Sequence, residues 1–313
     1  MNDTKVTVLM SVYHPEPAFL QKQLESIDEQ TYPEKQLLIW IDDPADTTTK
    51  AWIEKQSLSS PFEIRQAKEN LGYVKAFEKL VSMANTPYIA FSDQDDIWDP
   101  KKLEKCIRTL EEEEAVLVTT DRKTIDQDDQ VLSESDCRDH PNVQNSWRTG
   151  DHVVLEASVN CMAIGMAIVM RADAAKAAIP FPACTGHDKW LALTAGTCGK
   201  LAYIKEPLVS HRVHGRNLTG VLSGITCKKD YKLDRIDTSY ELAREFASRF
   251  SSCEDCGRIM AFATARKEGD IRGLWKNRQI APDIVKFEIL YQLIPDFLFK
   301  LVLQVVRKFA AKG

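Results

Sequence analysis

The stretch YIAFSDQDDIW (88–98) decides the fold class, because it joins a strand pattern to an acidic turn. Carboxylates follow the apolar part at once, at Asp93, Asp95 and Asp96. Open parallel sheets bind ligands at the carboxyl ends of their strands. Mg²⁺ and Mn²⁺ prefer one or two carboxylates together with phosphate oxygens of the substrate. Three unneutralised acids would repel each other, so we favour a metal loop over an acidic turn that only caps the next helix.

Strand and helix patterns alternate on the way to this loop. Apolar runs predict strands at 5–12, 36–42, 62–65 and 88–92, with helices beginning near residues 18, 48 and 73. This order predicts an α/β, Rossmann-like fold with a mainly parallel sheet flanked by helices. Beyond the loop, further core strands are predicted at 115–121 and 163–170, and a polar surface excursion at 122–150.

The pattern changes near residue 224, beyond which only helices are predicted. These helices are expected at 231–250, 255–267 and 282–312. We therefore predict two parts, a sheet-containing domain at 1–224 and a helical C-terminal region at 225–313.

The composition excludes several classes of protein. The 313 residues are 44% hydrophobic and 28% charged, as in ordinary globular proteins. Lys and Arg total 41 against 46 Asp and Glu, a net charge of −5, so nucleic acid is not an expected partner. Residues 6–12 predict a strand rather than a signal peptide, so the eight cysteines are expected to be reduced thiols in a cytoplasmic protein. Cys253 and Cys256 lack a second pair at zinc-ribbon spacing.

Two weaker motifs fall at the same predicted edge of the sheet. Asp42 and Asp43 end the second predicted strand, where an aspartate is either a helix cap or a ligand-binding group. Asn70-Leu71-Gly72 opens a helix, where glycine lets the backbone approach a ligand and the helix N-terminus suits phosphate.

Taken together, these motifs make the chain resemble the family 2 inverting glycosyltransferases, which have the GT-A fold. The resemblance covers roughly residues 5–220 and rests on VLMSVYHPEPAFLQKQLESIDEQTYP, IDDPAD, NLGYVKAFEKL, PYIAFSDQDDIWDPKKLEK and GHDKWLALTAGTCGKLAYIKEPLVSHRVHGRNLTG, in that order. The DQDDIW form and the ending H-D-x-W … R-x-H-x-x-N are most similar to bacterial transferases that build cell-surface polysaccharides, often rhamnosyltransferases.

The resemblance implies a role for each matching residue. Asp43 would bind the pyrimidine base of the donor, Asp95 and His214 would hold Mn²⁺ or Mg²⁺, and Asp188 would be the catalytic base. The donor-binding set is Val12, Tyr13, Asp43, Asn70, Gly72 and Asp93. His187 stands where the family has the first acid of an E-D pair. The Q-x-x-R-W motif of processive synthases is absent from the sequence, which favours a non-processive enzyme.

This set of residues suits an inverting transfer. The acceptor hydroxyl attacks the anomeric carbon in one displacement, so one base suffices, and a carboxylate with an ordinary pKa of about 3.9 is ionised at neutral pH. A cation stabilises the leaving nucleoside diphosphate without an acid. His14, His140 and His152 belong to no recognisable motif and are predicted to be surface or core residues without a catalytic or binding role.

The resemblance implies transfer of L-rhamnose from dTDP-rhamnose to a hydroxyl of a glycan or lipid-linked acceptor in bacterial cell-wall or capsule synthesis. One alternative is a family 2 enzyme that uses a UDP-hexose, because Asp43 would serve uracil and thymine alike. The other is a catalytically silent scaffold protein that binds nucleotide sugars, against which the intact acids argue.

The C-terminal stretch 286–312 mixes aromatic and aliphatic residues with five basic and two acidic ones, a charge of +3 in an acidic protein. Lys300 and Gln304 interrupt its apolar run, so an amphipathic helix at the membrane interface fits better than a membrane span. We expect a peripheral protein on the inner face of the cell membrane. The alternatives are a helix packed on the catalytic domain and a helix that forms a homodimer.

Overall fold

The computed structural model describes residues 4–139, 150, 153–159, 163–214 and 224–310. The chain divides into two compact units, Met1–His152 with Met162–His214, and Val153–Cys161 with Gly215–Gly313. The division falls after His214 rather than at the predicted residue 224. It also assigns residues 153–161, predicted within the first part, to the second unit. Each unit is described by itself.

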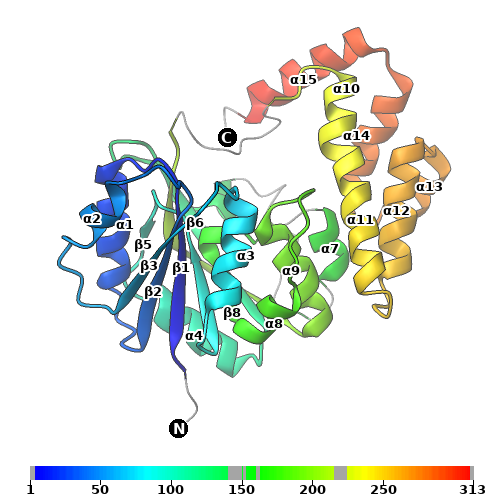
Figure 1. Ribbon diagram of the computed structural model, residues 1–313. Coiled ribbons are helices and arrows are strands. Elements are labelled where there is room, and N and C mark those ends of the chain that lie inside the picture. The colour runs from blue at the N-terminus through cyan, green and yellow to red at the C-terminus, as the bar shows by residue number, and fades with distance from the viewer. Residues whose placement is uncertain (1–3, 140–149, 151–152, 160–162, 215–223, 311–313) are drawn as a thin grey trace. The chain divides into compact units, whose positions relative to one another are not determined.

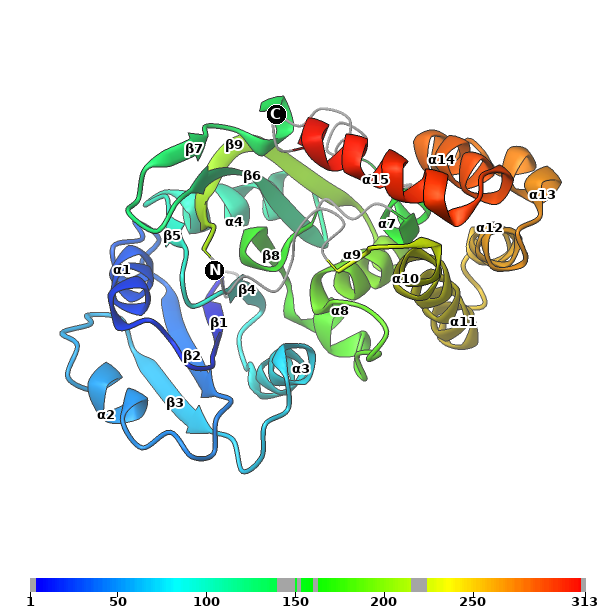
Figure 2. The ribbon, with the colours of Figure 1, turned by 90° about the horizontal axis from the view of Figure 1, so that it is seen from above.

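The first unit is built on a mixed sheet, nine-stranded over the described residues, in the order β3-β2-β1-β4-β8-β6-β9-β5, with β7 beside β6 (Figure 1, with all strands labelled in Figure 2). The strands are β1 (Val6–Val12), β2 (Lys35–Ile41), β3 (Phe62–Gln66), β4 (Tyr88–Ser92), β5 (Ile97–Trp98), β6 (Leu117–Ile125), β7 (Val131–Ser133), β8 (Ile168–Arg171) and β9 (Leu201–Arg212). The pairings β1–β2, β1–β4, β2–β3 and β6–β9 are parallel, and β5, β7 and β8 pair antiparallel.

Helices cover both faces of this sheet, and six of the seven residues of β1 are buried, as expected of a central parallel strand. The helices are α1 (Pro17–Asp28), α2 (Thr49–Ile53), α3 (Tyr73–Met83), α4 (Lys102–Glu112), α5 (Asp136–Asp139), α8 (Ala172–Ala177) and α9 (His187–Cys198). Leu24 of α1 and Leu103 of α4 join the core on one face, and Phe77 of α3 packs on Phe91 of β4 on the other (Figure 2). The predicted α/β, GT-A-like architecture is confirmed.

The region after α4 differs from its prediction. The predicted strand 163–170 begins with a 3₁₀ turn at Gly165–Ala167 and becomes β8 only at Ile168. The predicted excursion 122–150 contains the second half of β6, β7 and α5, and β9 was not predicted. The first part of β6 lies in the predicted strand 115–121, whereas its more polar continuation, residues 122–125, was assigned to the excursion. Asp121, 4% exposed, accepts hydrogen bonds from Ser135 Oγ (2.5 Å) and the Cys137 N–H (3.1 Å).

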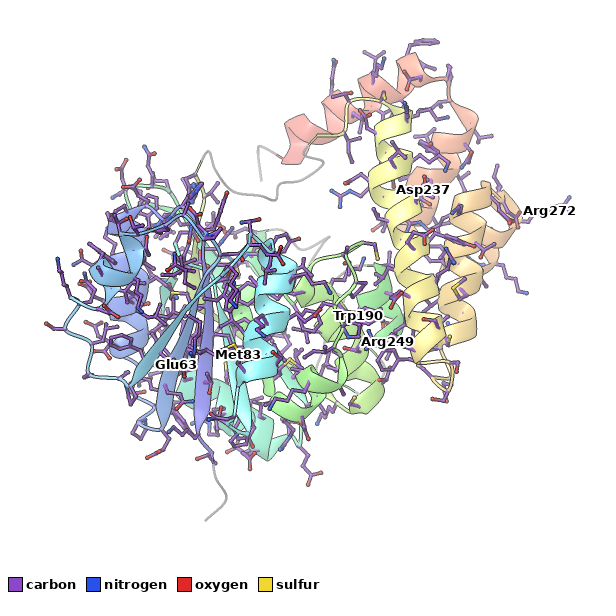
Figure 3. The ribbon with its side chains drawn as sticks, viewed as in Figure 1. Glu63, Met83, Trp190, Asp237, Arg249 and Arg272 are labelled. Carbon is purple, nitrogen blue, oxygen red and sulfur yellow. The ribbon has the colours of Figure 1, made fainter. Side chains whose placement is uncertain are left out.

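The described residues of the second unit form helices, as predicted for 225–313, and the helix Val154–Val159 is added from the part predicted to belong to the first domain. They are α7 (Val154–Val159), α10 (Lys228–Tyr231), the π-helix η2 (Lys232–Asp237), α11 (Thr238–Arg249), α12 (Cys256–Glu268), α13 (Ile271–Lys276), α14 (Pro282–Leu293) and α15 (Asp296–Ala310). Figure 3 labels Asp237, whose carboxylate accepts from Lys232 Nζ at 2.8 Å. The single predicted helix 282–312 is two helices. Pro295 disfavours helical backbone at Ile294, which is extended with ψ 148°.

A buried ion pair lies inside this unit. Arg266 on α12 and Glu288 on α14 are 4% and 0% exposed. Arg266 donates to Glu288 Oε1 through Nη2 (2.7 Å) and Nε (3.0 Å), and the Tyr231 hydroxyl donates to the same oxygen at 3.0 Å. Glu288, counted among the charges of a predicted surface helix, is therefore a core residue.

The predictions about the cysteines, two of the histidines and a membrane span are only partly covered by the described residues. Seven of the eight cysteines are described and all are free thiols, whereas Cys161, His140 and His152 lie outside the described residues. Among the helices that the structure describes, none is long and apolar enough to cross a membrane.

Candidate active site

The predicted donor-binding residues meet at one edge of the first unit's sheet. Strand β1 lies between β2 and β4, and parallel pairing brings Val12 beside Ile41 and Met10 beside Ser92. The segments that follow these three strands therefore begin side by side. They carry Tyr13, Asp43 and Asp93, three of the residues singled out in the sequence.

The acidic loop after β4 holds its carboxylates in a poorly solvated environment. Burial raises the pKa of Asp93 to about 8, and the neighbouring Asp96 and Asp95 add to the effect. Burial is the main cause that raises the pKa of Asp95, and the charge of Asp96 is the second. The hydrogen bond from His214 lowers this pKa and so opposes them. A bound cation would relieve this repulsion between acids.

Asp96 is the member of this loop whose role the sequence did not indicate. It is fully buried, and its Oδ1 accepts from His211 Nδ1 (3.1 Å) and from the Arg212 N–H (2.9 Å). Its Oδ2 has no hydrogen-bond partner among the described residues. These bonds tie the acidic loop to the end of β9.

The same tie brings His214 to Asp95, 119 residues away in the sequence. His214 Nε2 lies 2.8 Å from Asp95 Oδ2. Arg212, fully buried, donates from Nε to the Asp95 carbonyl at 2.9 Å and stacks over the Phe19 ring. The two residues predicted to hold a metal are therefore adjacent.

The donor set fits a metal that the substrate completes. Among the described residues, no three His, Cys, Asp or Glu side chains form a ready-made metal site. Asp95 and His214 supply one carboxylate oxygen and one imidazole nitrogen. Mg²⁺ and Mn²⁺ accept such partial sets where phosphate oxygens fill the other positions.

Asp42 fastens the end of β2 to the start of α3. It is 2% exposed, and it accepts from Trp40 Nε1 (3.0 Å) and from the N–H groups of Leu71 (3.1 Å) and Gly72 (2.8 Å). Asn70 Nδ2 donates to the Asp42 carbonyl at 2.8 Å. Gly72, with φ 74°, is needed for this turn. The polar groups predicted to meet the donor phosphate at Asn70 and Gly72 are thus bonded to Asp42, and their contact with a donor stays a prediction.

Tyr13 and Asp43 are connected by His14, which was predicted to be an ordinary residue. His14 Nε2 lies 3.1 Å from Asp43 Oδ2, and the rings of Tyr13 and His14 stack with centroids 4.0 Å apart. Gln94 clamps this segment, accepting from the Tyr13 N–H (2.8 Å) and donating to its carbonyl (3.0 Å). Gln94 was not singled out from the sequence, and the signal that could have indicated its role is its position between Asp93 and Asp95.

Asp188 lies in the first turn of α9, after the N-cap Gly186. Burial and the charges of Asp188 and Asp93 together raise the pKa of Tyr73, which begins α3. The ring of the preceding His187 lies 6.0 Å from the ring of Tyr73 and 5.5 Å from that of Phe91, two residues before Asp93, as measured between ring centroids. The structure brings the predicted base to the same region as the acidic loop.

His187 does not replace the acid that the resemblance implies at this position. It is 4% exposed, stacks on Phe77 at 4.1 Å, and neither ring nitrogen has a hydrogen-bond partner among the described residues. Burial lowers its pKa to about 4, so the ring is neutral at physiological pH. Trp190, labelled in Figure 3, also anchors α9, through its Nε1–H bond to the Ala178 carbonyl (2.8 Å).

Comparison with known proteins identifies the family. Residues 7–176 match Glycosyl transferase family 2. The chain belongs to this family and is a glycosyltransferase. An uncharacterized glycosyltransferase of Nostoc sp. is 21% identical over 283 residues, 87% of this chain and 86% of that protein. The amylovoran biosynthesis glycosyltransferase AmsE of Erwinia amylovora is 30% identical over 114 residues, 36% of this chain and 43% of AmsE.

Solved structures support the fold. A crystal structure of residues 1–349 of S. aureus TarS in complex with UDP-GlcNAc superimposes with a TM-score of 0.60 and 15% identity, over 90% of this chain and 82% of that one. The chain spans 52% of the longer TarS structure. The family match includes Asp43, Asp93 and Asp95 but ends before Asp188 and His214, and the roles of these last two stay predictions.

Proposed function

We propose that this protein is a metal-dependent, inverting glycosyltransferase that moves one sugar from a dTDP- or UDP-linked donor to an acceptor hydroxyl. One observation carries the proposal. Asp43, the Asp93–Asp95 loop with His214, and Asp188 gather at one edge of the first unit, where a base-binding group, a diphosphate site and a proton acceptor are all needed.

Each group has one task in this reaction. The Asp188 carboxylate takes the proton of the acceptor hydroxyl as that oxygen attacks the anomeric carbon. Asp95 and His214 would hold Mn²⁺ or Mg²⁺, which neutralises the charge that develops on the leaving diphosphate. Asp43 accepts a hydrogen bond from the pyrimidine. One ionised base suffices, whereas glycoside hydrolases need two carboxyl groups across the scissile bond.

We propose L-rhamnose from dTDP-rhamnose as the sugar, because the DQDDIW and H-D-x-W motifs resemble rhamnosyltransferases. The TarS complex with UDP-GlcNAc favours a UDP-hexose as the second candidate. The name of AmsE, an amylovoran biosynthesis enzyme, supports a glycan or lipid-linked acceptor in bacterial polysaccharide synthesis.

The test is release of UDP or dTDP from a panel of nucleotide sugars, with Mn²⁺ and with EDTA. We expect release only with metal, and the Asp95→Asn variant should lose at least about 10² of the rate, since it removes the carboxylate ligand of the cation. Asp99→Asn, an exposed aspartate just beyond the loop, is the control. Equal rates with Mn²⁺ and EDTA would exclude the metal, and no release from any donor would favour the silent scaffold.

We further propose that the second unit rests on a membrane surface. Large apolar side chains are exposed along α14 and α15, with exposed fractions of 41% for Leu290, 68% for Leu293, 66% for Phe297 and 54% for Leu301. Lys286 and Lys300 accompany them but pair with Asp283 and Asp296. Apolar burial therefore supplies most of the expected affinity.

Substitution is a sharper test of this surface than truncation, because Glu288, Tyr291 and Phe299 belong to the core of the unit. We expect Leu293→Asp with Phe297→Asp to lower sedimentation with anionic liposomes by at least about tenfold, since each fully buried side chain of this size contributes about 1.5–3 kcal/mol. Trp275→Asp, an exposed apolar site on α13, is the control. Unchanged sedimentation would contradict the membrane role, and loss of a dimer in ultracentrifugation would favour the homodimer.

A further inference from the structure

The backbone of His14 is unusual for its residue type. Its φ of 44° lies in the left-handed region, which costs free energy for any residue with a Cβ and is tolerated where the surroundings enforce it. Gln94 fixes the residue before His14, because its side-chain amide bonds both the N–H and the carbonyl of Tyr13. The acidic loop thus holds the backbone that leads into His14.

This conformation aims the imidazole at Asp43. The His14 side chain is 64% exposed and that of Asp43 18% exposed, and Nε2 donates to Oδ2 over 3.1 Å. The other carboxylate oxygen, Oδ1, accepts from the Ala45 N–H at 2.9 Å. With a donor on each oxygen the plane of the carboxylate is set, and each oxygen keeps a further lone pair for a ligand.

We propose that His14 is a positioning residue that makes the site selective for uracil and thymine, an inference that rests on the proposed function. Uracil and thymine have an imide N–H that can donate a hydrogen bond to the fixed Asp43 carboxylate. Cytosine has a lone pair at the same ring position, which the carboxylate repels. The stacked rings of Tyr13 and His14 add a flat aromatic surface on which a pyrimidine can lie.

The experiment is titration calorimetry of UDP, dTDP and CDP with Mn²⁺ on the full chain. We expect the wild type to bind UDP and dTDP at least about tenfold more tightly than CDP, because the site's polar group is left unpaired by the wrong base. His14→Phe keeps a ring on Tyr13 but has no donor, and its preference should fall to about twofold. His14→Gln, whose amide can donate to Asp43, should restore part of it.

A donor assay and a control variant complete the design. With the UDP-sugar that is turned over, the loss in His14→Phe should fall mainly on KM rather than kcat, since His14 acts on donor binding. Lys55→Ala, an exposed lysine of the same unit, is the control, and melting curves report folding. If His14→Phe folds and discriminates between UDP and CDP as the wild type does, the inference is wrong and the proposed function stands. If the wild type binds no nucleoside diphosphate, both are wrong.

Discussion

Asp188→Asn is expected to lower sugar transfer by about 10²–10⁴-fold while donor binding survives. The amide keeps the size and much of the hydrogen-bonding shape of the carboxylate but cannot take a proton from the acceptor hydroxyl. Donor affinity should be unchanged, because the proposed contacts with the donor's pyrimidine ring and with the metal are made by Asp43, Asp95 and His214. The measurement is single-turnover transfer, with UDP or dTDP affinity measured on the same preparation.

The competing role of Asp188 is purely structural, and the chain offers a matched control. Asp188 Oδ1 accepts from the Lys189 N–H at 2.7 Å in the first turn of α9. Asp173 accepts from the Ala174 N–H at 2.7 Å in the first turn of α8. Each Asn variant should cost at most about 1 kcal/mol of stability through the helix terminus. Only Asp188→Asn should lose transfer. If Asp188→Asn transfers sugar at nearly the wild-type rate, another acid of the site must be the catalytic base.

The sequence alone predicted the half of the site that depends on local pattern. Apolar runs followed by acids place Asp43 and Asp93 at the carboxyl ends of two strands of one parallel sheet, because the chain order of βαβ units leaves few topologies, and the structure has these strands on either side of β1. Asp95 follows from the same loop. These predictions need only strand periodicity and the rule that ligands bind at the carboxyl edge.

The other half depends on contacts that no local pattern encodes. Asp96 meets His211 across 115 residues through the pairing of β5 with β9, and β9 was not predicted. His14 joins the site through a left-handed backbone that its neighbours impose. In the second unit, Pro295 is a local signal that a helix ends. The burial of Glu288 has no local signal, because its partner Arg266 lies 22 residues earlier in the sequence.

That buried pair gives the largest stability effect that we expect. Glu288→Ala should lower the free energy of opening of the second unit by about 3–5 kcal/mol, because Arg266 would keep its charge without a partner in the core. Hydrogen exchange measured by mass spectrometry is the suitable readout, since it separates the two units of one chain. Protection of amides in α12 and α14 should fall by at least about 10²-fold, while β4 serves as the internal reference.

Two further variants separate the pair from its surroundings. Lys286→Ala removes an exposed ion pair on the same helix, in which the side chains of Lys286 and Asp283 are 72% and 80% exposed, and should change protection by less than about 1 kcal/mol. Arg266→Met with Glu288→Leu removes both charges and should recover most of the loss, since a buried ion pair often gains little over apolar residues of similar volume. If the double variant opens as easily as Glu288→Ala, packing and the Tyr231 hydroxyl stabilise the unit, and the unpaired charge is not the cause.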